Sequence, residues 1–92
     1  MAKWVRIVCE IPSVQEFLTG EVLRRARSLG LEGYAQNSGG SEIKVVVGGS
    51  RDSIEDFLDV FYESAARGQA GNLAVEPFLK DGDYRGVFRI IK

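Results

Sequence analysis

Apolar and polar residues alternate along the start of the chain. From Trp4 to Ile11, apolar side chains fill every second position, and the charged residues Arg6 and Glu10 stand between them. Because successive side chains of a strand point to opposite faces of a sheet, this alternation predicts a strand with one buried face. Pro12 has no backbone N–H to donate and ends the predicted strand.

After Pro12 the apolar residues recur at intervals of three and four, which is the period of an amphipathic helix. Ser13 and Glu16 match a capping box, in which each side chain accepts a hydrogen bond from the other residue's backbone N–H at the helix start. Gly30 suits a left-handed residue after the helix end. The sequence therefore predicts one helix between Ser13 and Gly30, with an apolar stripe made by Val14, Phe17, Leu18, Val22, Ala26 and Leu29.

Two strands joined by a short turn are predicted next. Residues 33–37 form the first, residues 38–41 the turn, and residues 42–47 the second. The second strand buries one face, and its other face is expected to meet solvent. The following glycines are expected to end the strand, and Ser50 to cap the next helix. The expected buried face carries Ile43, Val45 and Val47, and the expected solvent face carries Glu42, Lys44 and Val46.

A second amphipathic helix follows Ser50, with its acidic residues opposite the apolar stripe made by Ile54, Phe57, Leu58, Phe61 and Ala65. Residues 73–79 are predicted to form a fourth strand, where Pro77 favours the edge of a sheet or the end of a strand. Residues 80–83 contain an Asp-Gly pair that is typical of a hairpin turn. Residues 84–91 complete the predicted hairpin as the last strand.

The predicted order is β-α-β-β-α-β with an additional C-terminal strand. Two amphipathic helices can cover one face of an antiparallel sheet, and the usual solution for this order is a ferredoxin-like α/β sandwich of the α+β class. We expect residues 1–92 to form a single domain, because 92 residues are enough for one small core.

Composition narrows the classes of function. The net charge is −1, with 12 basic and 13 acidic residues, so we expect no nucleic-acid partner. No apolar run is long enough to span a bilayer, and the start of the chain does not look like a signal peptide, so we expect no membrane association. Cys9 is the only cysteine, which fits a reducing compartment, and we expect a cytoplasmic protein that is a monomer. Histidine, the commonest general base and metal ligand, does not occur, and we expect no metal or cofactor.

The run from Ser28 to Asn37 carries a resemblance to a known family. It contains Leu-Gly-Leu, one further residue, Gly-Tyr and a strand that ends in Asn37. This run resembles the middle of acylphosphatases, and Phe57-Leu58 and Tyr84-Arg85-Gly86 resemble later family positions. The resemblance implies an acylphosphatase-like domain, and it implies that Asn37 would orient the water that attacks a carboxyl-phosphate bond.

The phosphate-binding loop of that family has no counterpart here. Acylphosphatases carry a glycine-rich loop before the first helix, and its last residue is an arginine that holds the phosphate. Counted back from Leu29 without gaps, the loop positions fall on residues 11–19, which contain no glycine, and Thr19 stands at the arginine position. A shift of one residue places Gly20 there instead. Neither residue carries a charge, and Thr19 is not expected to be catalytic.

Individual residues also have structural interpretations. Asn37 is either the water-orienting residue or a turn residue that opens the hairpin at Ser38. Cys9 is expected to be a small core residue. Trp4, Arg6 and Val8 can form a surface patch as in RNA-binding modules, but the other central strand lacks aromatic residues.

Two functional hypotheses remain, and whether the protein is an enzyme depends on which is right. The first is an acylphosphatase-like domain with lost or strongly reduced hydrolysis that acts as a binding or interaction module. Its partner would be a small phosphorylated ligand or a protein. The second is a working acylphosphatase that uses Asn37 and a non-standard phosphate-binding residue. A ferredoxin-like domain with an unrelated partner is a third possibility.

Overall fold

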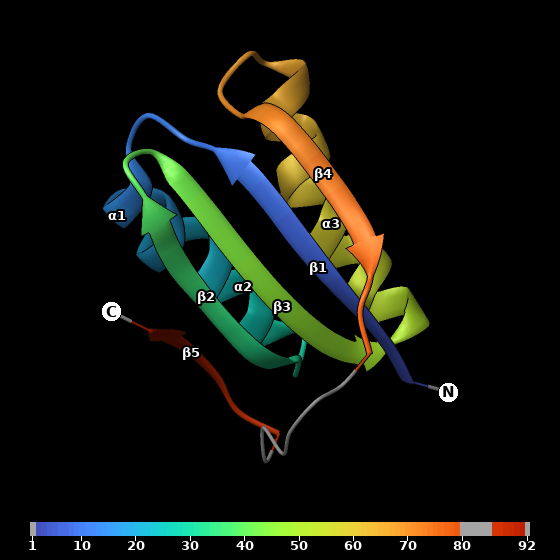
Figure 1. Cartoon of the computed structure of the whole chain (residues 1–92). Coiled ribbons are helices and arrows are strands. Elements are labelled where there is room, and N and C mark those ends of the chain that lie inside the picture. The colour runs from blue at the N-terminus through green and yellow to red at the C-terminus, as the bar shows by residue number, and fades with distance from the viewer. Residues whose placement is uncertain (1, 80–85, 92) are drawn as a thin grey trace.

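A computed structural model describes residues 2–79 and 86–91 (Figure 1). A five-stranded sheet carries all the helices on one face, and the other face, which we call the open face, carries none. The α+β class and the ferredoxin-like arrangement are thereby confirmed. In chain order the elements are β1 (Ala2–Glu10), α1 (Val14–Phe17), η1 (Leu18–Leu23), α2 (Arg24–Ser28), β2 (Glu32–Gly39), β3 (Glu42–Ser50), α3 (Arg51–Ala66), β4 (Gly71–Pro77) and β5 (Phe88–Ile91).

The sheet has the order β4-β1-β3-β2-β5, so β4 and β5 lie at opposite edges. The predicted hairpin between these strands is therefore wrong, although β4 is an edge strand as Pro77 indicated. The sheet is mixed rather than wholly antiparallel, because β5 pairs with β2 in parallel. Burial of Phe88 accounts for this placement, since at that edge its ring packs edge-on against Phe57 of α3, with centroids 6.2 Å apart. The turn predicted over residues 80–83 lies outside the described residues.

The elements α1, η1 and α2 follow one another without a break and form one helix, which we call the first helix. Its centre, η1, is π-helical. Leu18, Val22 and Ala26 of the predicted stripe are buried, and Val14, Phe17 and Leu29 are partly buried against the same core. The predicted capping box is wrong, because Ser13 caps the helix with no side-chain hydrogen bond. Its backbone carbonyl instead accepts the N–H of Phe17 at 3.0 Å. Gly30 has a φ of 68°, which confirms the predicted left-handed residue after the helix.

The expectation that Gly48 and Gly49 end the strand is wrong. Gly48 pairs with Trp4 of β1, and the strand continues to Ser50. A Cβ atom at Gly48 would lie 2.2 Å from the Trp4 indole ring, so the ring lies directly on the strand backbone. Glycine here makes room for an aromatic side chain rather than for a turn.

Val46 also departs from the expected pattern. It lies on the open face of the sheet, yet only 1% of its surface is exposed. Its strand neighbours on either side are Arg6 and Tyr34, whose larger side chains share this face. The expectation that Val46 meets solvent is therefore wrong, because cross-strand neighbours can cover a small side chain.

Aromatic rings join the two helices to each other and to the sheet. Phe17 of α1 and Phe61 of α3 pack edge-on with centroids 5.7 Å apart, and Phe57 packs in the same way on Phe61 at 5.4 Å. Ser50 caps α3 as predicted, since its side chain accepts the N–H of Ser53 at 3.2 Å. These contacts fix where the start of the first helix lies against the end of α3. Within the described residues, no helix is long and apolar enough to cross a membrane.

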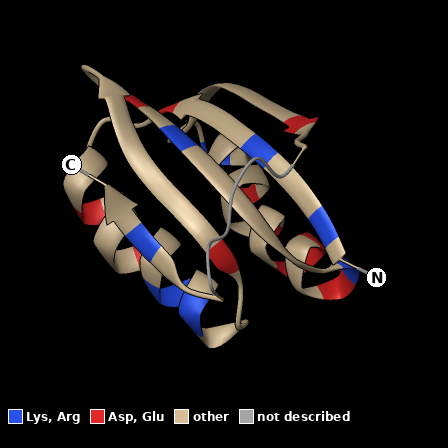
Figure 2. Cartoon of the chain, turned by 60° about the horizontal axis from the view of Figure 1, so that its bottom comes forward, with Lys and Arg blue, Asp and Glu red and all other residues tan. Residues whose placement is uncertain are grey.

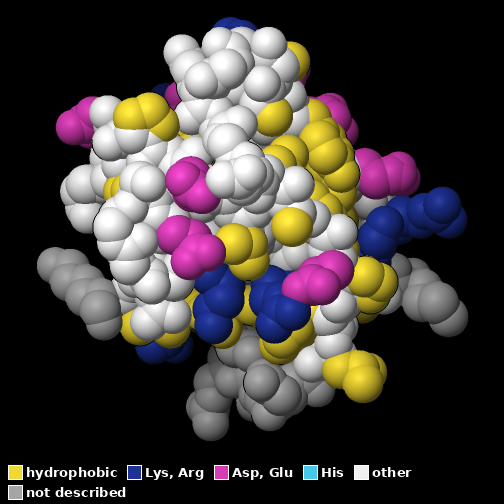
Figure 3. Space-filling model, turned by 45° about the horizontal axis from the view of Figure 1, so that its top comes forward, with side chains coloured by type: hydrophobic (Ala, Val, Ile, Leu, Met, Phe, Trp, Pro, Cys, Tyr) yellow, Lys and Arg dark blue, Asp and Glu magenta, His cyan; other side chains and the backbone are white. Residues whose placement is uncertain are grey.

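The open face is polar, with charges of both signs. Arg6 of β1 forms an ion pair with Glu76 of β4, and the Lys44 ammonium lies 5.8 Å from the centroid of the Tyr34 ring. Figure 2 shows basic and acidic residues on neighbouring strands, and Figure 3 shows cations and carboxylates interspersed among apolar side chains. The described surface therefore has no single sign of charge on the faces in view.

Candidate functional site

The connection between β1 and the first helix is the segment that would have to hold a phosphate. The Ile11 N–H donates to the Ser41 carbonyl at 2.8 Å, and Pro12 has no N–H. The helix begins at Val14, directly after this segment. An anion nest needs successive free N–H groups that converge on one point. Residues 11–13 do not provide that arrangement, because one N–H is used by the hairpin and the next is missing.

Thr19 lies inside η1 and is exposed. Its hydroxyl donates to the Gln15 carbonyl at 2.9 Å, which is a bond within the helix. A threonine at this position supplies no positive charge for a phosphate. At Gly20, the alternative position, a Cβ would meet no atom within 4 Å outside the backbone of its own helix.

The π-helical centre contains both candidate positions for the loop arginine. A π-helix closes its hydrogen bonds over one residue more than an α-helix does, so it accommodates one extra residue in the same length. The two possible arginine positions, Thr19 and Gly20, differ by one residue and both lie within η1. Neither alignment brings a charged side chain to the position.

Asn37 lies at the end of β2, where both ends of its amide group take part in the turn. Its Oδ1 accepts the Gly39 N–H at 2.9 Å, and its Nδ2 donates to the Gly40 carbonyl at 3.1 Å. These bonds are those of a residue that stabilises the hairpin. The same hairpin carries Ser41, whose carbonyl binds the Ile11 N–H, so Asn37 and the connection lie at the same end of the sheet.

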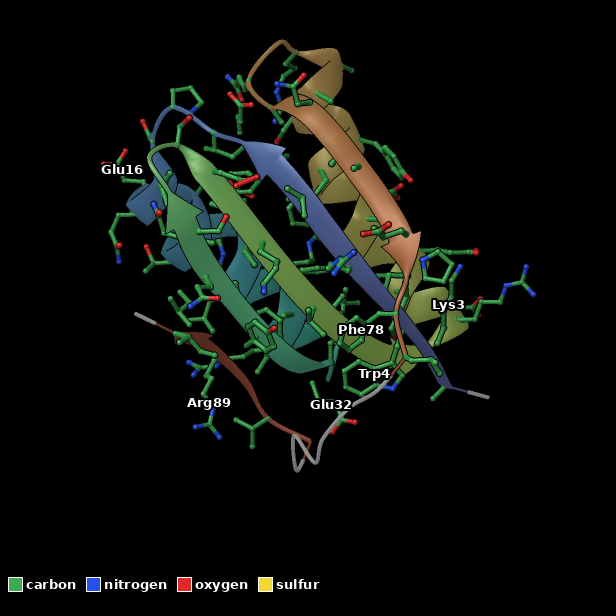
Figure 4. The ribbon with its side chains drawn as sticks, in the orientation of Figure 1. Lys3, Trp4, Glu16, Glu32, Phe78 and Arg89 are labelled. Carbon is green, nitrogen blue, oxygen red and sulfur yellow. The ribbon has the colours of Figure 1, made fainter. Side chains whose placement is uncertain are left out.

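A hollow of about 360 Å³ opens on the helix side of the connection. The first helix contributes Glu16 and Glu21, and α3 with its following turn contributes Ser64 and Arg67. Figure 4 places Glu16 at the start of the first helix, and Asn37 and Thr19 do not line the hollow. Its full lining is Ile11, Pro12, Ser13, Glu16, Phe17, Glu21, Ser64, Arg67 and Gln69.

Sequence reasoning did not single out Ser64 or Arg67. One signal for Ser64 was present, since it stands three residues after Phe61 on the apolar stripe of α3, where a polar residue is out of place. Only 3% of its surface is exposed. Arg67 gave no such signal, because an arginine near a helix end is common.

Cys9 is buried on the helix side of β1, as predicted for a core residue. Burial raises the pKa of its thiol to about 11, because the thiolate would lose its hydration. A thiol that stays protonated is a poor nucleophile. Among residues 2–79 and 86–91, no group of three or more acidic, histidine or cysteine side chains is placed to hold a metal ion.

Comparison with known proteins places these features in a family. A family model described as Acylphosphatase matches residues 14–90. The match begins at the first residue of α1, so β1 and the connection fall outside it.

Solved structures share the fold at low sequence identity. An acylphosphatase from Coxiella burnetii is 24% identical with a TM-score of 0.72, over 98% of this chain and 93% of that one. An acylphosphatase from Bacillus subtilis is 15% identical with a TM-score of 0.78, over the whole of both chains. The structure of T. kodakarensis HypF is 22% identical with a TM-score of 0.75, over all of this chain and 12% of that one. The same fold therefore occurs both as a separate chain and as part of a larger protein.

Proposed function

Because the chain belongs to the acylphosphatase family, we propose that it is a member with lost or strongly reduced acyl-phosphate hydrolysis that acts as a binding or interaction module. One observation carries this proposal. Residues 11–19, the segment aligned with the family's loop, offer neither a glycine-rich amide nest nor an arginine, because Pro12 lacks an N–H and Thr19 stands at the arginine position.

The chemistry of the reaction explains why this loss matters. Phosphoryl transfer relies on positioning and on cations that stabilise the charge of the transition state. An arginine in that role commonly contributes about 10³–10⁵ in rate. Glu16, in the first turn of the helix, adds a negative charge where a phosphate would sit. We therefore expect hydrolysis to be slower by about 10³ or more than in an active acylphosphatase.

Hydrolysis of benzoyl phosphate tests the proposal directly. The purified chain is assayed beside the Bacillus subtilis acylphosphatase under the same conditions. We expect a rate at least about 10³ lower than that of the control enzyme. A rate within tenfold of the control would overturn the proposal.

A second function, a working acylphosphatase, is supported by the position of Asn37. The hairpin of Asn37 lies against the connection through the bond from Ile11 to Ser41, so a water held by Asn37 would lie at that end of the sheet. Arg67 is a candidate for the non-standard phosphate-binding residue, because it lines a hollow together with Ser13.

Variants separate this alternative from contaminating activity. If the chain hydrolyses benzoyl phosphate by this route, Asn37→Ala and Arg67→Gln each reduce kcat by tenfold or more. Arg27→Gln is the control, because Arg27 is exposed on α2 and does not line the hollow. Hydrolysis that is unchanged in Asn37→Ala would exclude the alternative.

The proposal also includes a single domain over residues 1–92, a monomeric state and a cytoplasmic location. The family match over residues 14–90 supports the single domain. The lone buried thiol of Cys9 is compatible with a reducing compartment. The expected partner is a small phosphorylated ligand or a protein. Analytical ultracentrifugation of the purified chain tests the monomeric state.

A further inference from the structure

Ser64 is a buried polar residue whose hydroxyl has no partner within the described residues. Its backbone carbonyl accepts the N–H groups of Gln69 and Ala70, but its side chain makes no hydrogen bond there. Within the described residues, every fully enclosed side-chain nitrogen or oxygen has a hydrogen-bond partner. Because the Ser64 hydroxyl has no partner, it is not fully enclosed, and we infer that it opens into the hollow that Ser64 lines. A buried hydroxyl that faces a hollow is available to bind a ligand.

Charged side chains of both signs line the same hollow. Arg67 comes from the end of α3, and Glu16 and Glu21 come from the first helix. Within the described residues, Arg67 forms no ion pair with either carboxylate. All three charges therefore remain available to a molecule placed between the helices.

The size and the remaining lining favour a small ligand. A volume of about 360 Å³ lies near the lower end of the range for small-molecule sites, which is roughly 300–1,000 Å³. Ile11, Pro12 and Phe17 add an apolar side to the hollow. A molecule of a few carbon atoms with charged ends matches this combination.

We propose that this hollow binds a small zwitterion, with a carboxylate or phosphate group at one end and a primary ammonium group at the other. Arg67 and the Ser64 hydroxyl donate to the oxyanion, and Glu16 and Glu21 accept from the ammonium group. The site gives a ligand class to the binding role proposed above and rests on that role. Part of its lining belongs to residues 11–19, the segment aligned with the family's phosphate loop, but neither Thr19 nor Asn37 lines it, and the groups proposed to hold the oxyanion come from the end of α3.

Titration of the ¹⁵N-labelled full chain, followed by backbone amide NMR, tests the site. O-Phosphoethanolamine and β-alanine are the two probes, and they distinguish phosphate from carboxylate as the oxyanion. Inorganic phosphate, acetate and ethylammonium are the single-ended controls. We expect at least one zwitterion to shift the amides around the hollow and to bind about tenfold more tightly than the controls, because its two ends bind together.

Variants of the lining residues identify the groups that bind. Ser64→Ala should weaken binding about fivefold, which corresponds to one lost hydrogen bond. Arg67→Gln should weaken binding about tenfold or more, because it removes a charge-assisted bond. Arg27→Gln, the exposed control on α2, should bind as the wild type does. The same spectra report whether each variant is folded.

Three results would overturn the proposal. The first is that neither zwitterion shifts the amides around the hollow at 20 mM, which is about the limit of a useful weak site. The second is that the single-ended controls bind as tightly as the zwitterions. The third is that Ser64→Ala and Arg67→Gln both bind with unchanged affinity. The benzoyl phosphate assay on the same sample tests the proposed function separately. If the sample hydrolyses benzoyl phosphate at the control rate and binds the zwitterion, the binding site stands and the proposed loss of hydrolysis is wrong. If the sample neither hydrolyses benzoyl phosphate nor binds the zwitterion, the loss of hydrolysis stands and the binding site is wrong.

Discussion

The β2–β3 hairpin and the first helix differ in how tightly they are packed around their glycines. In the hairpin, Gly33 leaves no room for a side chain, since a Cβ there would lie 2.0 Å from the Val46 carbonyl oxygen. In the first helix, Ser13 makes no side-chain capping bond, and a Cβ at Gly20 would meet no atom within 4 Å outside the backbone of its own helix. Packing fixes the sequence of the hairpin more strictly than that of the first helix at these positions.

This difference shows that the family resemblance is evidence for the fold rather than for the activity. The run from Ser28 to Asn37, which carries the resemblance, includes Gly30 and Gly33, both with positive φ angles. The departures lie in residues 11–19, where the fold does not depend on glycine. A likeness concentrated in tightly constrained backbone is evidence for the scaffold, whereas function depends on the less constrained segment.

The largest effect is expected from Gly33→Ala. Its φ of 135° is unfavourable for alanine, and the added methyl group would collide with the Val46 carbonyl. We expect a loss of about 3 kcal/mol or more in the free energy of unfolding, measured by urea denaturation.

Gly39→Ala is the matched control, because Gly39 has a φ of 134° but no atom within 4 Å of the added Cβ. It should cost only about 1–2 kcal/mol, which is the backbone strain alone. Equal losses in the two variants would mean that the collision at Gly33 is relieved by a shift of β3.

The second effect is a pH dependence that arises from Cys9, at the end of the packed sheet. The pKa of its thiol is about 11 in the folded chain, against an ordinary value of 9.0. An acid whose pKa is raised by folding holds its proton more tightly when folded. Its stabilising contribution is therefore complete below pH 9 and is lost as the pH rises from 9 to 11. The total loss is about 2–3 kcal/mol.

Urea denaturation between pH 8 and pH 11 measures this loss. Cys9→Ala is the control, because it removes the thiol but leaves the lysines and tyrosines that titrate in the same range. The difference between the two pH profiles gives the contribution of Cys9. Parallel profiles would show that the thiol ionises as easily in the folded chain as in the unfolded one.

A third effect compares the starts of the two helices. Ser50 caps α3 through its bond from the Ser53 N–H, so Ser50→Ala should cost about 1 kcal/mol. Ser13 makes no such bond, so Ser13→Ala should change the free energy of unfolding by less than about 0.3 kcal/mol. Thermal and urea denaturation of the two variants check this. An equal cost would mean that Ser13 caps its helix in solution.

The smallest effect is expected at Gly20. It lies within η1 at an ordinary φ, and an added methyl group meets no atom within 4 Å. Gly20→Ala should therefore stabilise the chain by about 0.5–1 kcal/mol, because alanine loses less backbone freedom on folding. Urea denaturation measures the change. A loss of stability would show that the π-helical centre requires glycine.

Most of the fold could be predicted from local patterns. Alternation gave β1, the three-and-four spacing gave both helices, and Gly30 and Ser50 marked a helix end and a helix start as they do in the structure. The edge position of β5 could not be found in this way. An Asp-Gly turn is a local signal, whereas the pairing of β5 with β2 depends on Phe88 meeting Phe57, which is distant in sequence.

The site was less accessible to sequence reasoning. The family's arginine position could be assigned to Thr19, because the assignment needed only a count back from Leu29. The π-helical centre could not, since its apolar spacing matches that of an α-helix. The hollow could not be predicted either, because Glu16 and Ser64 meet only after the two helices pack together.

The Trp4 ring that lies on Gly48 has a spectroscopic consequence. Trp4 is the only tryptophan of the chain, and it spans β1 and β3 at the opposite end of β1 from the connection to the first helix. Its fluorescence therefore depends on the pairing of these two strands. Intensity should change when the sheet unfolds and remain constant when a ligand enters the hollow, so this single residue provides an optical signal for folding that is independent of binding.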